Sequence, residues 1–330
     1  MRRRFGDTSD RRGADGHRLD RGDRPGDAPG SEGRRPRGAP DRHARAERHQ
    51  PQKRQGVPRP AAAHDRPADR QGRAVVTSWD HVADWYDKLV GDEGSDYHRH
   101  VVLPAAMRLL DPQPGEKVLD LCCGQGVFVR QLAQLPAVQV VGVDASPSLI
   151  EAARRRGSGP NLRYVVADAC NLGDLADGSF DGVACLMAVH DLDDIEAMFR
   201  GVAKALRQGG RAVLVLMHPC FRVPRQSSWG WDDQKKTQYR RLDRYYTPMT
   251  IPIATHPGRH PETRTLFFHR PISAYINALA AAGLAVVACE ELLSHHKSQP
   301  GGHSRGENRS RQEFPVFVAL KALKLAIHSA

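Results

Sequence analysis

Residues 117–126, with the sequence Lys-Val-Leu-Asp-Leu-Cys-Cys-Gly-Gln-Gly, have the residue types expected of a loop that binds a small ligand. An apolar strand leads into Gly124 and Gly126, and glycines without a Cβ atom let a ligand approach the backbone closely. Asp120, which precedes the glycines, would repel a pyrophosphate and could accept a hydrogen bond from a cationic ligand. The third glycine of a dinucleotide fingerprint would fall at Val129, which counts against NAD.

Two further acids follow predicted strands. Residues 138–144 form an apolar run that ends at Asp144, and residues 162–169 form a third strand that contains Asp168. An acid at the end of the second strand commonly accepts hydrogen bonds from ribose hydroxyls. Ser146 predicts the N-cap of the next helix.

Alternating helix and strand patterns continue to the C-terminus and predict an α/β protein. Residues 78–90 predict an amphipathic helix capped by Ser78, followed by a second helix over 97–110. The later expected elements are strand 180–190, a helix stop at 206–211, strand 212–217, helix 271–282 ended by Gly283, and strands 284–293 and 314–320.

From about Trp79 onward, this order resembles the class I S-adenosylmethionine (SAM)-dependent methyltransferases, of the small-molecule type 11/25. The resemblance implies a doubly wound, Rossmann-like sheet of seven strands in the order 3-2-1-4-5-7-6, with the last two strands antiparallel. It also implies an N-terminal helical lid, an insertion after strand 5 over residues 218–270, and SAM as the cofactor.

The same resemblance implies a set of cofactor-binding residues: Asp120, Cys122, Gly124, Gly126, Asp144, Ala145, Asp168, Ala169 and Leu186. The three acids take, in chain order, the methionyl end, the ribose hydroxyls and the adenine amino group. Leu186 offers its carbonyl to the methionyl amine. Cys122 departs from the pattern, because the family often has glycine there, although cysteine is small enough to fit.

Three residues are candidates for catalysis or acceptor contact: His218, His190 and Tyr86. Both histidines follow predicted strands, and the carboxyl ends of parallel strands meet at one edge of a sheet. A histidine there could take a proton from an acceptor near neutral pH, or it could simply cap a strand. Tyr86 lies on the predicted lid helix and could face the cofactor or pack in an aromatic stripe.

The insertion after strand 5 carries ten basic and four acidic residues. Its aromatic residues include Trp229, Trp231, Tyr239, Tyr245, Tyr246, Phe267 and Phe268. Such a long connection is usually functional, and aromatic rings with arginines suit a planar or acidic small molecule. Stacking on RNA bases and a covering subdomain are the alternatives. The polar, basic connection 294–313 could close over the acceptor or be a mobile loop.

The net charge of +11 over 330 residues is concentrated at the front of the chain. Residues 1–75 hold 20 basic and 11 acidic residues, whereas the rest holds 29 and 27. Residues 1–75 are too poor in apolar side chains to fold, and we expect disorder there. This segment either binds polyanions weakly or does not belong to the working protein, which would then start at Val75 or Val76.

The six cysteines contain no Cys-x-x-Cys pair and predict reduced, buried thiols in a cytoplasmic protein. No ligand pair has zinc-site spacing, so we expect no metal, and no apolar run is long enough for a membrane span.

The predicted activity is methyl transfer from SAM to an O, N or C nucleophile of a small molecule. The alternatives are an RNA or protein methyltransferase and a non-catalytic protein that binds polyanions through the tail. The Asn/Asp-Pro-Pro-Tyr motif of many amino-directed nucleic-acid enzymes is absent after the fourth strand, where the sequence reads Leu-Met-Ala-Val over residues 186–189.

Overall fold

A computed structural model describes residues 79–256 and 260–325. These residues belong to the second of two units, which spans residues 63–330. The predictions made for residues 1–75, for a start at Val75 or Val76 and for the Ser78 cap lie outside the described residues.

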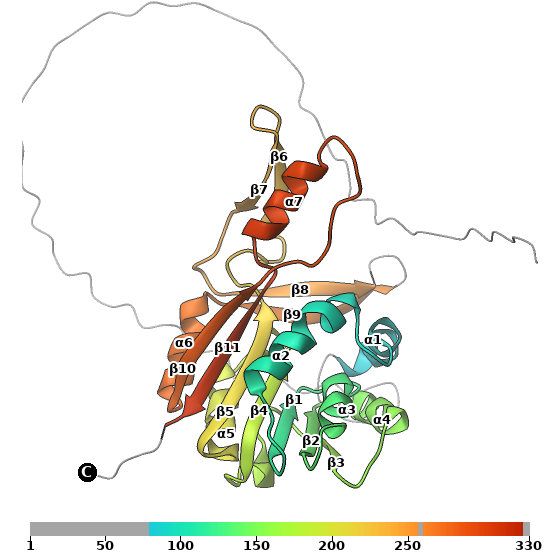
Figure 1. Cartoon of the computed structure of the whole chain (residues 1–330), viewed down its shortest axis with the longest axis vertical. Coiled ribbons are helices and arrows are strands. Elements are labelled where there is room, and N and C mark those ends of the chain that lie inside the picture. The colour runs from blue at the N-terminus through green and yellow to red at the C-terminus, as the bar shows by residue number, and fades with distance from the viewer. Residues whose placement is uncertain (1–78, 257–259, 326–330) are drawn as a thin grey trace, which may run out of the picture. The chain divides into compact units, whose positions relative to one another are not determined.

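The core is a seven-stranded mixed sheet with the order β10-β11-β5-β4-β1-β2-β3, which confirms the predicted order 3-2-1-4-5-7-6 (Figure 1). Strands β1 to β5 are mutually parallel, and β11 runs antiparallel to both of its neighbours. The bounds are β1 Lys117–Leu121, β2 Gln139–Asp144, β3 Leu162–Val166, β4 Phe180–Leu186, β5 Leu206–Met217, β10 Leu284–Leu292 and β11 Phe317–Lys324.

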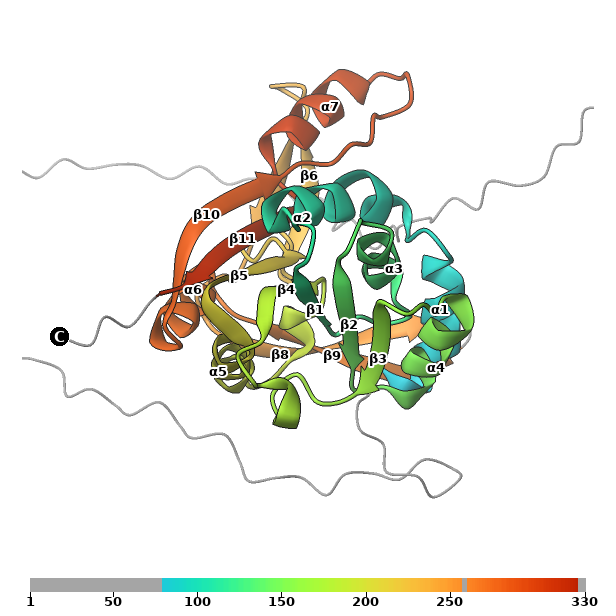
Figure 2. The same ribbon diagram turned by 60° about the horizontal axis from the view of Figure 1, so that its bottom comes forward.

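Helices cover both faces of the sheet. Successive strand residues point to opposite faces, and apolar side chains on both faces need to be buried. The helices are α2 Leu103–Leu110, α3 Val127–Ala133, α4 Pro147–Arg156, α5 Ile195–Ala205 and α6 Ile272–Ala281. Val118 packs in a core cluster with α2, α3 and α4, whereas the adjacent Leu119 packs in a cluster with α5 and α6 (Figure 2). The sheet is therefore buried on both sides, as a doubly wound fold requires.

The predicted N-terminal lid consists of the short turn η1 Asp80–Val82 and helix α1 Ala83–Val90, followed by the π-helical turn η2 His98–Val102 that leads into α2. Asp80 Oδ1 accepts hydrogen bonds from Ser146 Oγ at 2.6 Å and from the Ser148 amide at 3.2 Å. At the other end of α4, Arg156 Nε donates to Asp87 Oδ1 at 2.8 Å. Polar contacts at both ends of α4 thus hold the lid in place. Ser146 caps α4 as predicted, because its hydroxyl accepts from the Leu149 amide.

The insertion folds into two hairpins, β6 Ser227–Asp232 with β7 Thr237–Leu242 and β8 Met249–His256 with β9 His260–His269. The β8–β9 hairpin lies across the carboxyl ends of the parallel strands (Figure 1). Ile251 of β8 and Phe267 of β9 form a small buried apolar cluster with Val223, which precedes β6. This small core agrees with the covering-subdomain alternative, and the hairpin also forms a wall above the sheet.

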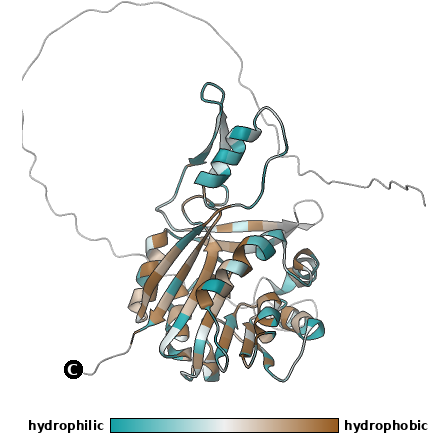
Figure 3. Cartoon of the chain, viewed as in Figure 1, coloured by the Kyte–Doolittle hydropathy of each residue, from teal (hydrophilic) through white to brown (hydrophobic). Residues whose placement is uncertain are grey.

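One expected loop is partly a helix. The connection between β10 and β11 contains α7 Ser304–Glu313, which packs on β7. This helix is hydrophilic on nearly every side (Figure 3) and gives no apolar periodicity to detect. It packs through small residues instead, since Ser310 Oγ donates to the Gln238 carbonyl at 2.6 Å and a Cβ atom at Gly306 would lie 2.7 Å from the Trp231 ring.

Several boundaries differ from the sequence prediction. The fifth strand begins at Leu206, so residues 206–211 belong to β5, where a register shift against β4 absorbs the two glycines. The fourth strand ends at Leu186, and His190 lies in the turn η4 Val189–Asp191.

The prediction of buried thiols was wrong in part, because the side-chain packing around most cysteines is incomplete. Of the six free cysteines, Cys185 is buried, Cys289 is exposed and the other four are half-buried. Within the described part of the chain, no helix is both long and apolar enough to span a membrane.

Candidate functional site

The loop after β1 folds as a tight turn at the carboxyl edge of the sheet. Cys122, Gly124 and Gly126 all have left-handed backbones, with φ values of +55°, +56° and +82°. The Gly124 amide donates to Asp144 Oδ2 at 2.9 Å, which fastens the loop to the end of β2. Asp144 therefore orients the loop as well as bordering the site.

Both glycines are required by close neighbours. A Cβ atom on Gly126 would lie 2.4 Å from the Tyr164 hydroxyl, and one on Gly124 would lie 3.2 Å from a ring carbon of Tyr86. The second distance shows that Tyr86, on the lid helix, lies directly over the glycine loop. Tyr86 also stacks edge-on against Trp79, with ring centroids 5.4 Å apart.

Two acids are buried beneath this lid. Asp120 is 2% exposed and Asp144 is 8% exposed. Burial raises the pKa of Asp120 well above its usual value, and the charge of Asp144 raises it further. Burial also raises the pKa of Asp144, although the Ser146 and Gly124 amides oppose the shift. A cationic ligand group beside these carboxyls would offset the cost of ionising them.

A cavity of about 540 Å³ opens at this edge of the sheet. Its floor includes Cys122, Gly124, Asp144, Ala145 and Leu186. The lid contributes Trp79, Trp85 and Tyr86, and the insertion contributes Arg222, Arg240, Thr265 and Phe267. A smaller pocket of about 30 Å³, bordered by Asp120, Cys122, Tyr86 and Leu186, lies next to it. One continuous space thus connects the glycine loop to the insertion.

Backbone strain marks the floor of this cavity. Cys122 and Met187 are non-glycine residues with φ values of +55° and +59°. They directly follow β1 and β4, which are neighbouring strands, and both line the cavity. Left-handed conformations of such residues cost about 1–3 kcal/mol each and gather at functional sites.

His190 lines the cavity and is 5% exposed. Burial lowers its pKa to about 4, so the ring is neutral at physiological pH. Its Nδ1 atom is buried without a hydrogen-bond partner among the described residues, and its ring packs on Phe267 with a centroid distance of 4.8 Å. The adjacent Asp191 also lines the cavity, and burial raises its pKa well above the usual value.

His218 is 1% exposed and is missing from the described residues that line the cavity. Its Nδ1 accepts from the Cys220 amide at 3.2 Å, which leaves Nε2 to donate to Glu291 Oε1 at 2.9 Å. Burial lowers the pKa of this ring, although Glu291 opposes the shift. With both nitrogens engaged, the geometry favours a loop-holding role, and a catalytic role for His218 stays a prediction.

The predicted adenine contacts, Asp168 and Ala169, are not among the described residues that line the cavity. Asp168 Oδ1 accepts from the Cys170 amide at 2.9 Å, and Ala169 is buried. Gly126 is likewise not among the described lining residues, and it lies against Tyr164. Their contacts with the cofactor stay predictions.

Two arginines on the insertion were not singled out by sequence reasoning. Arg240 Nε donates to the Phe221 carbonyl at 2.8 Å, and its Nη2 donates to Ser227 Oγ at 2.6 Å. For the Arg222 guanidinium, no hydrogen-bond or ion-pair partner exists among the described residues. Sequence reasoning missed Asp191 as well. Its position next to His190 was the signal available for Asp191, and the basic composition of the insertion was the signal available for the two arginines.

Comparisons with known proteins agree with this geometry. Residues 118–210 match the family described as Methyltransferase domain. An uncharacterized methyltransferase of Synechocystis sp. is 38% identical over 162 residues, which cover 47% of this chain and 70% of that protein. The crystal structure of an S-adenosylmethionine-dependent methyltransferase from Mesorhizobium loti aligns with a TM-score of 0.54 and 28% identity, over 67% of this chain and 96% of that one. The chain belongs to the S-adenosylmethionine-dependent methyltransferases.

A demethylmenaquinone methyltransferase of Corynebacterium kroppenstedtii is 37% identical over 147 residues. The match covers 43% of this chain and 59% of that protein, so it leaves a large part of both sequences unmatched.

The residues of this methyltransferase fit the cofactor of its family. SAM carries a sulfonium and an ammonium group, which suit the buried carboxyl of Asp120, and it carries ribose hydroxyls, which suit the buried carboxyl of Asp144 as a hydrogen-bond acceptor. Gly124 leaves room beneath Tyr86 that a side chain would narrow. When bound, SAM supplies an electrophilic methyl group whose leaving group departs neutral.

Proposed function

We propose that the chain transfers the methyl group of SAM to a planar, anionic small molecule held beneath the insertion. The division of charge in the cavity carries this proposal. Asp144 and Asp191 lie on the side of the sheet, and Arg222 and Arg240 lie on the side of the insertion. A cationic donor and an anionic acceptor would therefore each meet the opposite charge.

On the sheet side, the proposed contacts follow the family pattern. Asp120 would accept from the methionyl amine together with the Leu186 carbonyl, and Asp144 with its neighbour Ala145 would hold the ribose. Asp168 and Ala169 would contact adenine, which requires the ligand to reach past the present cavity lining.

On the insertion side, the two arginines form a half-buried cationic pair. Burial lowers the pKa of both guanidinium groups, and the charge of Arg222 lowers that of Arg240 further. The contacts of Arg240 are to neutral oxygens, and it lies over the Trp229 ring at 4.9 Å. A carboxylate or phosphate between the arginines would relieve their repulsion and form charge-assisted hydrogen bonds.

A planar acceptor is supported by the aromatic walls of the cavity. Trp85 and Tyr86 border it from the lid, and Phe267 borders it from β9. Rings of this kind stack on flat ligands with centroid distances of about 4.5–7 Å. Relatives named as methyltransferases of demethylmenaquinone and of 2-phytyl-1,4-naphtoquinone have flat acceptors, which agrees with this part of the proposal.

The protein's own part in the reaction is to align and to exclude water. The lid covers the methyl donor, and the arginines fix the acceptor by its anionic group. His190, held neutral by burial, is proposed to accept a hydrogen bond from a hydroxyl nucleophile of the acceptor and to take up its proton as the methyl carbon leaves sulfur and bonds to oxygen. Such a bond orients a hydroxyl nucleophile, which makes O-methyl transfer the reaction that we favour.

The test uses the full chain with methyl-tritiated SAM and a low-molecular-weight cell extract, separated on an anion exchanger into anionic and neutral pools. Label should enter the anionic pool. The Arg240→Gln variant should raise the KM for that pool by about 10- to 100-fold, as expected for a lost charge-assisted hydrogen bond. Its affinity for S-adenosylhomocysteine should stay unchanged.

Arg241→Gln is the matched control. Arg241 neighbours Arg240 on β7, but its side chain is 67% exposed and pairs with Asp243. Label in the neutral pool, or only in macromolecular RNA or protein, would overturn the anionic small-molecule acceptor. Equal increases of the KM for the anionic pool in Arg240→Gln and Arg241→Gln would overturn it as well.

The domain boundary and the location are also proposals. We propose that residues 76–330 form the methyltransferase domain and that residues 1–75 are dispensable for it. A chain that begins at Val76 should keep the labelling activity, and its loss would show that the segment contributes. The six free cysteines fit a reducing compartment, which supports a cytoplasmic location.

A further inference from the structure

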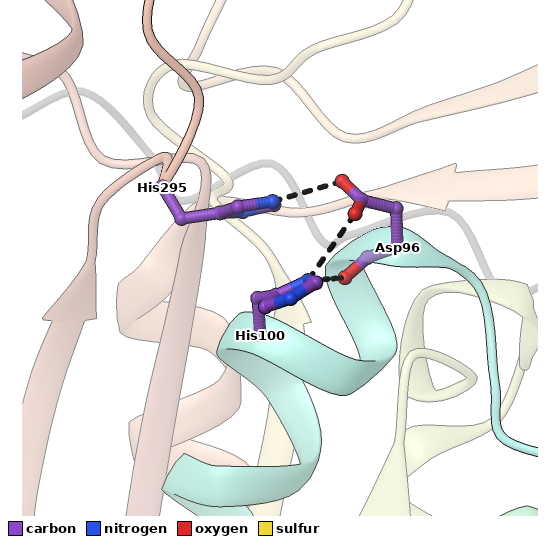
Figure 4. A group of neighbouring side chains, drawn as sticks. All are labelled: Asp96, His100 and His295. Carbon is purple, nitrogen blue, oxygen red and sulfur yellow. Dashed lines mark hydrogen bonds and ion pairs between the residues drawn. The ribbon is translucent and has the colours of Figure 1, made fainter. Parts of the chain in front are cut away.

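Away from the cavity, a cluster of imidazole and carboxylate groups joins two segments that are far apart in the sequence. Asp96 lies just before η2, His100 lies one helical turn later within η2, and His295 follows β10 (Figure 4). The adjacent His296 faces the same carboxylate. None of these residues has a part in the proposed methyl transfer.

The distances in this cluster are short. His295 Nε2 lies 2.9 Å and His296 Nε2 lies 3.1 Å from Asp96 Oδ2, and His100 Nδ1 lies 3.2 Å from Asp96 Oδ1. One ligand atom each from Asp96, His100 and His295 fall within 4.8 Å of one another. Around a tetrahedral ion with bonds of about 2.0–2.1 Å, ligand atoms are about 3.4 Å apart, so small side-chain rotations would complete a coordination sphere.

Hydrogen bonding accounts for only part of the arrangement. His100 Nδ1 donates to the backbone carbonyl of Asp96 at 3.0 Å, a bond that would be given up if this nitrogen bound an ion. Asp96 Oδ2 is buried, and among the described residues it has no hydrogen-bond partner, despite the two nearby imidazole nitrogens. His295 and His296 are close enough to form ion pairs with this oxygen, but neither nitrogen makes a hydrogen bond to it. A buried carboxylate oxygen without a partner is costly, and a bound cation would satisfy it.

The surroundings hold the ligands in place. Tyr97 donates to or accepts from Ser294 Oγ at 2.9 Å and packs edge-on against both His295 and His296. The rings of His100 and His295 are stacked, with centroids 4.6 Å apart. The side chain of His295 is 27% exposed, so an ion can enter from solvent while the imidazole stays oriented.

We propose that Asp96, His100 and His295 bind a divalent transition-metal ion, with Zn²⁺ as the best match, and that His296 is available as the fourth ligand. Imidazole with one carboxylate suits Zn²⁺ rather than Ca²⁺ or Mg²⁺, which prefer all-oxygen sites. The ion would clamp the start of η2 to the segment after β10. It has a structural role in this proposal and takes no part in methyl transfer.

The test measures Zn²⁺ binding by the full chain, first stripped with a chelator, in competition with a coloured zinc indicator. We expect one site per chain whose affinity falls at least about 100-fold in His295→Ala and in Asp96→Asn. Co²⁺ in the same site should give the visible absorption of a tetrahedral complex. Binding of S-adenosylhomocysteine by each variant confirms that it is folded.

His81→Ala is the matched control, because His81 is an exposed histidine outside the cluster. The histidines of residues 1–75 are present in every variant and contribute equally to the background. An equal loss in His81→Ala would mean an adventitious ion only. Unchanged Zn²⁺ binding in His295→Ala and Asp96→Asn would also overturn the site. So would a free energy of unfolding of the wild type that does not change when Zn²⁺ is added.

Discussion

Gly126→Ala tests whether the glycine loop is shaped by close approach or by backbone conformation alone. Gly126 has φ +82°, and a Cβ atom there would lie 2.4 Å from the Tyr164 hydroxyl and 2.9 Å from a carbon of its ring. A Cβ atom at Gly142 would also meet a carbon of the same ring, at 2.9 Å. The ring is buried and lies close to both glycines, so it cannot withdraw easily.

Gly115→Ala separates the cost of a left-handed alanine backbone from the cost of a close contact at the new Cβ atom. Gly115 has φ +88°, nearly the same conformation, but a Cβ atom there meets nothing within 4 Å. A left-handed alanine costs about 1–2 kcal/mol, and forcing an atom into a packed core costs about 1–3 kcal/mol more. We therefore expect Gly115→Ala to lower the free energy of unfolding by about 1–2 kcal/mol and Gly126→Ala by about 2–5 kcal/mol.

Urea unfolding of both variants measures the difference between their free energies of unfolding, provided that the denaturant slope is unchanged. Calorimetry with S-adenosylhomocysteine should show weakened binding only in Gly126→Ala, since only that glycine belongs to the loop. Adding Tyr164→Phe should recover part of the loss, because it removes the nearest atom, the Tyr164 hydroxyl, which has no hydrogen-bond partner among the described residues. Equal stability losses at Gly126 and Gly115 would refute the argument from close approach.

Two further predictions concern buried groups at the cavity. Asp144→Ala should weaken SAM binding by about 1–3 kcal/mol, because it removes both the proposed ribose contact and the carboxylate that holds the Gly124 amide; calorimetric affinity equal to that of the wild type would place the ribose elsewhere. Because burial lowers the pKa of His190 to about 4 from 6.5, the unfolded chain binds a proton that the folded protein excludes, so this group has no effect on stability well above pH 6.5 and destabilises the fold progressively as the pH falls from 6.5 toward 4. Between about pH 7 and pH 5 the free energy of unfolding should drop by about 2 kcal/mol more in the wild type than in His190→Gln, and parallel pH profiles in urea unfolding would contradict it.

The elements of the sheet could be predicted because they depend on local signals, whereas the order of the strands was implied by the resemblance to the methyltransferase family. The apolar runs around Asp120 and Asp144, the glycines after β1 and the Ser146 cap each identify an element without knowledge of its partners. Helix α7 escaped prediction because its sequence is polar on all sides and packs through Gly306 and Ser310.

The side of the cavity that the insertion forms could not be predicted, because it depends on how the two hairpins of the insertion fold back over the sheet. Arg222 and Arg240 are separated by most of the β6–β7 hairpin, and no spacing rule brings them together. The proposed metal site is a stronger case, because its ligands come from segments almost 200 residues apart, as the Tyr97–Ser294 hydrogen bond across 197 positions shows. The expectation of no metal relied on spacing along the chain and could not detect such a cluster.

The two ends of the cavity differ in how firmly they are held, and this difference indicates how an acceptor would enter. The floor is formed by strand ends of a sheet buried on both faces, with the left-handed Cys122 and Met187 held in place by that packing. The wall rests on a three-residue apolar cluster around Phe267 and on polar contacts such as those of Arg240. Because regions with few buried apolar contacts open at lower free energy, the insertion should open before the sheet does. An acceptor can thus enter from the side of the insertion while the glycine loop keeps its shape.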